Sequence, residues 1–186
     1  LAASGRTTAL ISSGDAGIYG MATVVFELLA RKPKPKWVEV TIEVIPGISA
    51  MQAAAARVGA PLAHDFCVIS LSDLLTPWTL IAKRIDLAGQ GDFAVAFYNA
   101  VSNKRSWQLL EARKTLLRYR QPETPVIVAF NVTRKGEQIT LTTLGKLDPE
   151  PLNMLSLVLV GNSETRRVGP WVYTPRGYHI KSELSD

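Results

Sequence analysis

The sequence predicts an α/β protein built from two domains, residues 1–64 and residues 65–186. Strand and helix patterns alternate in the first domain, an order that is typical of a mostly parallel sheet. In the second domain several strand patterns follow one another with little helix between them, so we expect a mixed sheet there. The 186 residues are 47% hydrophobic and 20% charged, which is the composition of a globular chain.

The first predicted strand covers residues 7–11 and leads into a loop at residues 12–15. Asp15 suits the N-cap of a helix. The residues after it repeat apolar side chains near helical spacing, at Ile18, Met21, Val25, Leu28 and Leu29. Because a domain seldom begins with a buried strand and an elaborate loop, we expect the first strand of the fold to be missing from this chain.

A second strand and a second helix complete the first domain. Apolar and polar residues alternate over residues 38–44, which predicts a strand with one buried face. Residues 46–49 are Pro-Gly-Ile-Ser and turn the chain into an alanine-rich helix at residues 50–58, which Gly59 and Pro61 end. The basic run at residues 31–36 is either a solvated connection or a patch that steers an anionic ligand.

The second domain begins with a predicted strand at residues 67–71, and Thr76 and Pro77 open a helix that runs to about Ala88. A strand at residues 93–98 comes next, followed by a helix that Ser102 or Asn103 caps and that ends near Arg118. The remaining predicted strands, with a hairpin connection at residues 133–136, cover residues 126–130, 138–143, 156–160 and 171–174.

Composition and motifs exclude several classes of protein. No apolar stretch reaches the roughly 20 residues that cross a bilayer. A lone cysteine, Cys67, excludes a disulfide framework and suits a place in the core, and two histidines far apart, His64 and His179, predict no metal site. Gly14, Gly17 and Gly20 miss the spacing of a dinucleotide-binding loop, and neither a P-loop nor a nucleophile elbow is present. We expect a cytoplasmic protein.

The loops after the predicted strands are the candidate ligand site, because open α/β sheets bind ligands beyond the carboxyl ends of their strands. These loops are rich in glycine, serine and asparagine and poor in charge, so backbone groups can approach a ligand closely. That chemistry favours a neutral, flat heterocycle or a nucleoside over a triphosphate. The loops cover residues 12–15, 45–49, 98–100, 131–133 and 161–163.

Two motifs carry a resemblance to a known family. Residues 13–20 are Ser-Gly-Asp-Ala-Gly-Ile-Tyr-Gly, and residues 44–50 are Val-Ile-Pro-Gly-Ile-Ser-Ala. In this combination the chain resembles the tetrapyrrole (corrin/porphyrin) methylases, S-adenosylmethionine-dependent enzymes of two α/β domains with the active site between them. Similarity to the members that act on precorrin-3B in cobalamin synthesis lies in residues 66–78, 97–99, 160–163 and 174–178.

The resemblance implies the tetrapyrrole methylase fold, a homodimer and a reaction. The reaction is methyl transfer from S-adenosyl-L-methionine, which leaves as S-adenosyl-L-homocysteine, to a ring carbon of precorrin-3B, with contraction of the ring to precorrin-4. Ala100 departs from the family, in which a proline is frequent at this position. The implied cofactor contacts are Ser13, Gly14, Asp15, Ile18, Ser49, Ala50, Asn99, Asn131 and Val132.

Several alternatives stay open at this stage. Ring contraction needs proton transfer, and the substrate-side candidates are Ser72, Asp73, Thr76 and His64. Metal-free precorrin and its cobalt-bearing counterpart both fit as substrates. An RNA methylase of the same superfamily would show one basic face, whereas the net charge of +5 is dispersed, so nucleic acid is not an expected partner. A truncated module that binds the cofactor without turnover is the third hypothesis.

Overall fold

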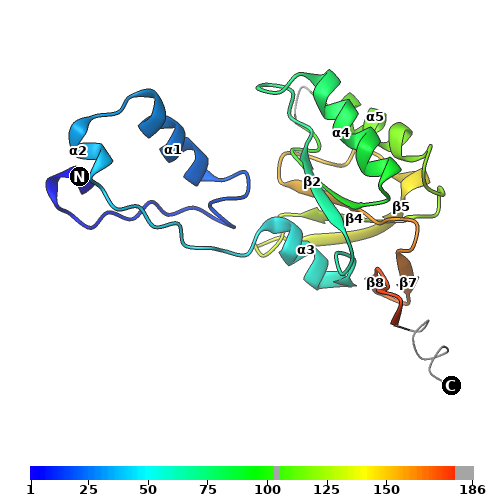
Figure 1. The fold of residues 1–186 in the computed structure, drawn as a ribbon. Coiled ribbons are helices and arrows are strands. Elements are labelled where there is room, and N and C mark those ends of the chain that lie inside the picture. The colour runs from blue at the N-terminus through cyan, green and yellow to red at the C-terminus, as the bar shows by residue number, and fades with distance from the viewer. Residues whose placement is uncertain (103–104, 179–186) are drawn as a thin grey trace. The chain divides into compact units, whose positions relative to one another are not determined.

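The computed structural model describes residues 1–102 and 105–178. It forms two compact units, Leu1–Ala50 and Met51–Asp186, each described here by itself (Figure 1). This division falls after Ala50, the first residue of the helix α3 (Ala50–Val58). The domain boundary near residues 63–66 stays a prediction. Within the described residues, no helix is both long and apolar enough to span a membrane.

The first unit contains helices and extended segments. Its elements are the 3-10 helix η1 (Ala2–Ser4), α1 (Met21–Arg31) and α2 (Pro35–Val38). The predicted strands at residues 7–11 and 38–44 are wrong, because residues 1–58, all of them described, contain no strand. A strand exists through hydrogen bonds to a neighbour, and neither segment pairs with one. The mostly parallel sheet expected in this half is therefore not formed, and Pro35 opens α2 where the second strand was expected to begin.

Asp15 is not the N-cap of α1. The helix begins at Met21 after Gly20, and Tyr19 has a left-handed backbone with φ of 51°. A left-handed residue interrupts a right-handed helix, so the segment between Asp15 and Gly20 is a loop. The carboxylate of Asp15 makes other contacts, which are described below.

The second unit follows the sequence prediction more closely. The predicted helix at residues 50–58 is α3 (Ala50–Val58), and each predicted strand of the second half is present. The sequence missed the short strand β7 (Arg166–Val168). The other elements are β1 (Gly59–Ala60), β2 (Phe66–Ser70), α4 (Trp78–Gln90), β3 (Ala94–Tyr98), α5 (Trp107–Leu116), β4 (Pro125–Phe130), β5 (Gln138–Thr143), the 3-10 helix η2 (Leu144–Lys146), β6 (Ser156–Val160) and β8 (Trp171–Tyr173).

One helix start differs from the prediction. Ser102 does not cap α5, because it forms an isolated bridge with Arg105, and the helix begins at Trp107 after Ser106. Asn103, the other predicted cap, lies outside the described residues.

A five-stranded mixed sheet in the order β2-β3-β6-β4-β5 forms the centre of this unit. β2 and β3 are parallel, whereas β6 runs antiparallel to both β3 and β4, and β5 runs antiparallel to β4. Helices α4 and α5 cover one face, with Ile85 and Leu109 packed against Phe97 and Val158 of the sheet (Figure 1). Cys67 is half-buried against this core, as predicted.

A smaller sheet, in the order β1-β8-β7, joins the end of α3 to the C-terminal strands. Gly59 pairs with Val172, has φ of 128°, and leaves no room for a side chain, because a Cβ there would lie 2.6 Å from the Val172 carbonyl oxygen. The tight pairing at Gly59 fixes the strand β8 beside the helix that precedes it.

Candidate functional site

The carboxyl ends of β2, β3 and β4 lie at one edge of the five-stranded sheet. β3 and β4 both run antiparallel to β6, so they point the same way, and β2 is parallel to β3. This topology brings the predicted loops after residues 98 and 130 to a common edge, together with the loop after residue 70. The edge carries hydroxyl and amide side chains, and ligands of open α/β sheets bind at such an edge.

Asn99 and Asn131 occupy corresponding positions at this edge. Each follows the last residue of a strand, and each has a left-handed backbone, with φ of 51° and 50°. Asparagine tolerates this conformation better than most residues, and such backbones cluster at binding and catalytic sites. The Asn99 side-chain amide donates to Ser70 Oγ at 3.0 Å, and that of Asn131 donates to the Lys135 carbonyl at 2.6 Å.

The start of α3 is attached to the same edge through Tyr98. The Met51 backbone N–H donates to the Tyr98 hydroxyl at 3.1 Å, across 47 residues of sequence. Tyr98 is the last residue of β3 and the neighbour of Asn99. Ser49, which directly precedes α3, is buried. The hydroxyl of Tyr98 therefore holds the first turn of α3 at the end of β3.

In the first unit, Asp15 joins the two motif-bearing loops. Its carboxylate accepts the Gly17 N–H at 2.7 Å and the Gly47 N–H at 3.1 Å. The hydrogen bond from Gly47, and then that from Gly17, lowers the pKa of Asp15 below its ordinary value. A Cβ on Gly47 would lie 2.2 Å from the Gly14 carbonyl oxygen, so only glycine allows this approach. The structure thus brings the loops of Ser13, Gly14, Asp15 and Ile18 and of Ser49 together.

The four substrate-side candidates are spread over the second unit. Asp73 accepts hydrogen bonds from Arg105 at 3.4 Å and from the buried Gln108 at 3.0 Å. His64 is half-exposed, with Nδ1 3.7 Å from the Asp65 carboxylate. Ser72 donates its backbone N–H to Ser70 Oγ at 3.3 Å, which places it near Asn99, and Thr76 is half-buried just before α4.

The loop at residues 161–163 does not share the candidate edge. Val160, the last residue of β6, pairs with Val95 near the start of β3, so the chain leaves β6 at the opposite edge. The expectation that this loop belongs to the ligand site is wrong, because β6 is antiparallel to its neighbours. Sequence patterns show where a strand lies but not its direction in the sheet.

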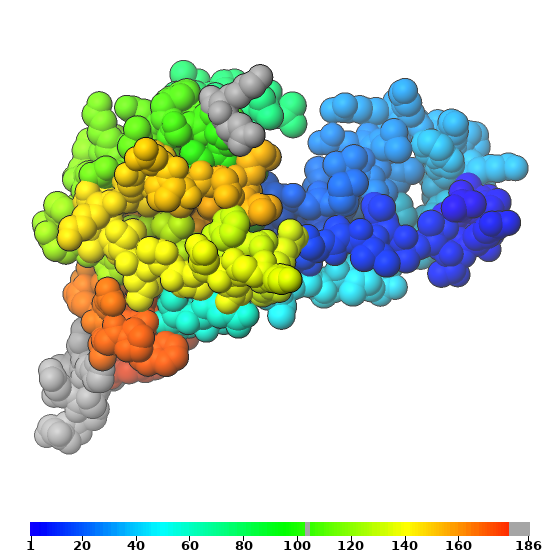
Figure 2. All heavy atoms as spheres, turned by 180° about the vertical axis from the view of Figure 1, so that it is seen from behind, coloured from blue at the N-terminus to red at the C-terminus, as the bar shows by residue number. Residues whose placement is uncertain are grey.

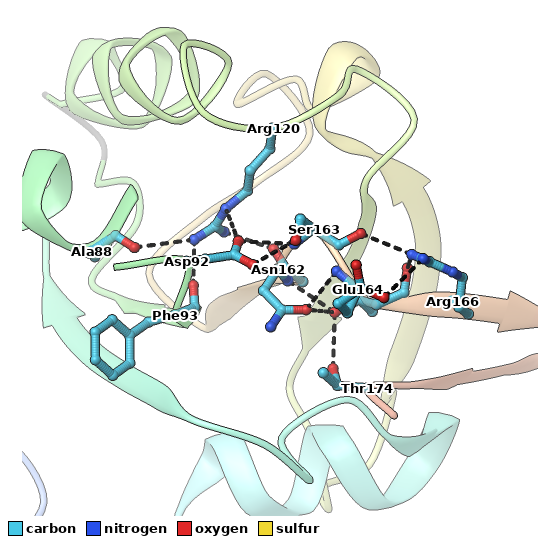
Figure 3. A network of polar contacts seen from close by, with 11 residues as sticks. Ala88, Asp92, Phe93, Arg120, Asn162, Ser163, Glu164, Arg166 and Thr174 are labelled. Carbon is cyan, nitrogen blue, oxygen red and sulfur yellow. Dashed lines mark hydrogen bonds and ion pairs between the residues drawn. The ribbon is translucent and has the colours of Figure 1, made fainter. Parts of the chain in front are cut away.

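The loop instead belongs to a buried polar network (Figure 3). The Arg120 guanidinium donates to the carbonyls of Gly161, Ala88 and Phe93, and lies 3.8 Å from Asp92. Asp92 accepts the Ser163 N–H at 2.9 Å. No sequence motif around Arg120 predicts that it binds these carbonyls.

A second part of the network binds the loop to β8. Asn162 Oδ1 accepts from Thr165 Oγ1 at 3.0 Å, and the hydroxyls of Thr165 and Thr174 lie 2.8 Å apart. Thr174 in turn donates to the Pro61 carbonyl at 2.7 Å. The predicted Asn162 motif is therefore structural: it connects β6, β8 and the segment after β1.

A cavity of about 310 Å³ lies over β4 and β5. Val128, Phe130, Thr140 and Leu152 are among the residues that line it. None of the sequence-predicted site residues is among them. We place the candidate site at the strand ends instead, because ligands of open α/β sheets bind there and left-handed non-glycine backbones cluster at functional sites.

These features define a class of protein. It is an α/β protein in which the described ends of β2, β3 and β4 carry amide and hydroxyl side chains. A nucleoside-type ligand at these strand ends stays a prediction of the sequence.

The comparisons with known proteins agree with this class. Residues 1–148 match the family model described as tetrapyrrole (corrin/porphyrin) methylases. A cobalt-factor III methyltransferase of Priestia megaterium is 50% identical over 184 residues, which are 99% of this chain and 34% of that protein. A precorrin-3B C(17)-methyltransferase of Sinorhizobium sp is 42% identical over 182 residues, 95% of this chain and 71% of that protein.

A solved structure gives the same result for the fold. The crystal structure of the methyltransferase CobJ matches with a TM-score of 0.87 and 45% identity, over 94% of this chain and 72% of that one. The chain therefore belongs to the tetrapyrrole methylase family. The predicted membership of a methyltransferase family of cobalamin biosynthesis is confirmed, and the chain spans about a third of one relative's length and about seven tenths of the other's.

Proposed function

We propose that this chain binds S-adenosylmethionine and directs its methyl group to carbon 17 of a corrin-precursor tetrapyrrole. The observation that carries the proposal is the Asp15 carboxylate, which joins the two loops that bear the family's motifs. The names of relatives at 42% and 50% identity support the reaction and its substrate class. Homodimer formation and a cytoplasmic location stay predictions.

The donor set of the site suits this cofactor. The candidate contacts are Ser13, Gly14, Asp15, Ile18, Ser49 and Ala50 in the first unit and Asn99, Asn131 and Val132 in the second. They offer backbone and amide groups to an adenine base, a ribose and an amino-acid moiety, which are mostly neutral or zwitterionic. When bound, the cofactor supplies a sulfonium-activated methyl group. The residues need only align it with a ring carbon and exclude water, and alignment can lower a barrier by about 7–11 kcal/mol.

Ring contraction to precorrin-4 is part of the proposal, and it requires proton transfer. The candidates are Ser72, Asp73, Thr76 and His64. Among them, His64 is a histidine, the side chain most often used for general acid–base catalysis, and its half-exposed ring is accessible to water. Asp73 is engaged by Arg105 and Gln108, so we assign it to holding the loop after β2.

Calorimetry with S-adenosylhomocysteine tests the cofactor site. We expect a Kd of about micromolar for the chain of residues 1–186, at least tenfold weaker binding for Gly47→Ala and Asp15→Asn, and unchanged binding for the control Glu27→Gln. Glu27 is an exposed carboxylate on α1 that pairs with Arg31 at 3.5 Å. Equal affinity of all four proteins would contradict the assigned site.

Turnover then separates the remaining hypotheses. The chain is incubated with S-adenosylmethionine and either precorrin-3B or cobalt-factor III, and the products are identified by mass spectrometry. Methylation of one substrate confirms the reaction and selects the metal-free or the cobalt form. Cofactor binding without turnover of either would favour the hypothesis of a cofactor-binding module, and absence of binding would contradict the proposed function.

A further inference from the structure

An ion pair links the last turn of α3 to the connection between β4 and β5. Arg57 Nε donates to Glu137 Oε1 at 2.7 Å, and Arg57 Nη2 donates to Glu137 Oε2 at 3.2 Å. The two residues are 80 positions apart in the sequence. This two-pronged geometry fixes the orientation of both side chains, as paired guanidinium and carboxylate groups do.

Glu137 also holds the connection itself. Its Oε2 accepts the Thr133 backbone N–H at 2.5 Å, so one carboxylate binds both α3 and the turn at residues 131–137. Within this turn, the Arg134 N–H donates to the Asn131 carbonyl and the Glu137 N–H to the Arg134 carbonyl. Asn131 and Thr133 both have left-handed backbones, with φ of 50° and 66°. Such backbones persist only where surrounding contacts hold them.

The pair contributes little to global stability by its location. The side chains of Arg57 and Glu137 are 48% and 24% exposed, and exposed ion pairs are weak stabilisers. The β4–β5 connection leads into β5, the strand at one edge of the sheet, and its residues 133–136 are exposed. β5 is yellow in the space-filling view of Figure 2. A contact of this kind can set the shape of one turn without deciding whether the domain folds.

The turn carries two of the predicted cofactor contacts, Asn131 and Val132. Helix α3 carries another at its first residue, Ala50, and its next residue, Met51, is bound to Tyr98. One helix is thus attached at its start to the end of β3 and at its end to the turn after β4.

We propose that Arg57 and Glu137 are positioning residues that hold the turn at residues 131–137 in the conformation in which Asn131 and Val132 contact the cofactor. This proposal rests on the proposed function. Glu137 has two tasks in it, to accept the Arg57 guanidinium and to accept the Thr133 N–H. Neither residue touches the reacting methyl group.

The test compares S-adenosylhomocysteine affinity and the protection of the turn from hydrogen exchange in five variants. Glu137→Gln weakens the contact with Arg57, and we expect about tenfold weaker binding, the effect of one charged hydrogen bond. Arg57→Lys keeps a positive charge and restores part of the affinity that Arg57→Ala loses. The control is Glu164→Gln, which removes the carboxylate of a more exposed surface pair with Arg166 at 3.0 Å and leaves binding unchanged.

A double variant with the two charges exchanged separates the two tasks of Glu137. Arg57→Glu combined with Glu137→Arg can restore an ion pair, but arginine has no acceptor for the Thr133 N–H. We therefore expect the double variant to bind as weakly as Glu137→Gln. Full recovery of affinity would show that only the ion pair matters and would overturn the two tasks assigned to Glu137.

Hydrogen exchange distinguishes failure of this proposal from failure of the proposed function. We expect faster amide exchange at residues 133–137 in Glu137→Gln than in the unaltered chain, with the urea midpoint of unfolding unchanged. If the unaltered chain binds cofactor and the variants bind equally well, the positioning role is overturned while the proposed function stands. If the unaltered chain does not bind, the proposed function fails, and with it the cofactor role of the turn, whatever the exchange shows.

Discussion

The buried guanidinium of Arg120 gives the strongest prediction about stability. Its side chain is fully buried, and it donates to the carbonyls of Gly161 at 2.6 Å, of Ala88 at 3.3 Å and of Phe93 (Figure 3). Burial lowers the pKa of Arg120, and the nearby Asp92 carboxylate opposes this shift. Even so, an arginine with a lowered pKa stays charged at neutral pH.

Replacing Arg120 with methionine keeps an apolar stem of similar length but removes every donor. Three carbonyls then each lose a hydrogen bond, although that of Ala88 keeps the one from the Phe93 N–H. Breaking a buried charged contact costs about 3–5 kcal/mol. Because the Asp92 side chain is 39% exposed and can be solvated by water, we expect a loss at the lower end of this range. With a urea m-value of about 2 kcal/mol per molar, the midpoint falls by about 1.5 M.

Urea unfolding monitored by tryptophan fluorescence measures this loss, with Arg118→Met as the control. Arg118 lies two residues away, its side chain is 60% exposed, and it pairs with Asp86 at 2.6 Å, so its loss costs about 1 kcal/mol or less. Folded Arg120→Met protein should bind S-adenosylhomocysteine normally, because the network lies at the edge opposite Asn99 and Asn131. A loss equal to that of Arg118→Met would refute the reasoning.

Three further predictions concern single residues. The folded state lowers the pKa of Asp15 from its ordinary value of 3.8. The contribution of its hydrogen bonds to the stability of the folded state is therefore complete above that value and is lost as the pH falls through the lower, folded pKa. The Gly47 amide proton, followed by NMR, should titrate in that acidic range in the unaltered chain and should not titrate there in Asp15→Asn. Burial raises the pKa of the Cys67 thiol, so iodoacetamide at pH 8 should alkylate the native chain several-fold more slowly than the urea-unfolded chain, and equal rates would contradict the burial. Gly59→Ala places a Cβ 2.6 Å from the Val172 carbonyl oxygen at a φ of 128°, and should lower the free energy of unfolding by about 1–3 kcal/mol, measured against Gly169→Ala, which has open space.

The candidate site could be predicted from sequence where it depends on local chemistry. Loops made of Gly14, Asp15, Gly47 and Asn99 have backbone freedom and no charge cluster, and that pattern already indicated a neutral, nucleoside-like ligand. The partner of the Asp15 carboxylate could not be predicted, because Gly47 N–H lies 32 positions away. The preference of aspartate for N-caps predicts that Asp15 caps the helix that follows it. In the structure its carboxylate instead accepts the N–H of Gly47 in another loop.

Two failures of prediction share a physical cause. The alternating residues 38–44 match a strand pattern, but a strand forms only beside a partner, and no described strand pairs with them. The short strand β7 is the opposite case, a strand without a strand pattern. Its three residues are exposed and show no alternation, and they form a strand because they pair with β8. Hydrogen bonding between segments decides both cases.

The sequence by itself determined the helices α3 and α4, the hydrophobic strands of the second half, and the family to which the chain belongs. Each of these depends on residues close together in the chain, whose spacing sets burial and backbone preference. Only the tertiary structure decided that β6 runs antiparallel, which separates Asn162 from the edge of Asn99 and Asn131. It alone placed Arg57 against Glu137 and Arg120 against three carbonyls, because contacts between distant segments depend on how strands are ordered and directed, and no local pattern encodes that order.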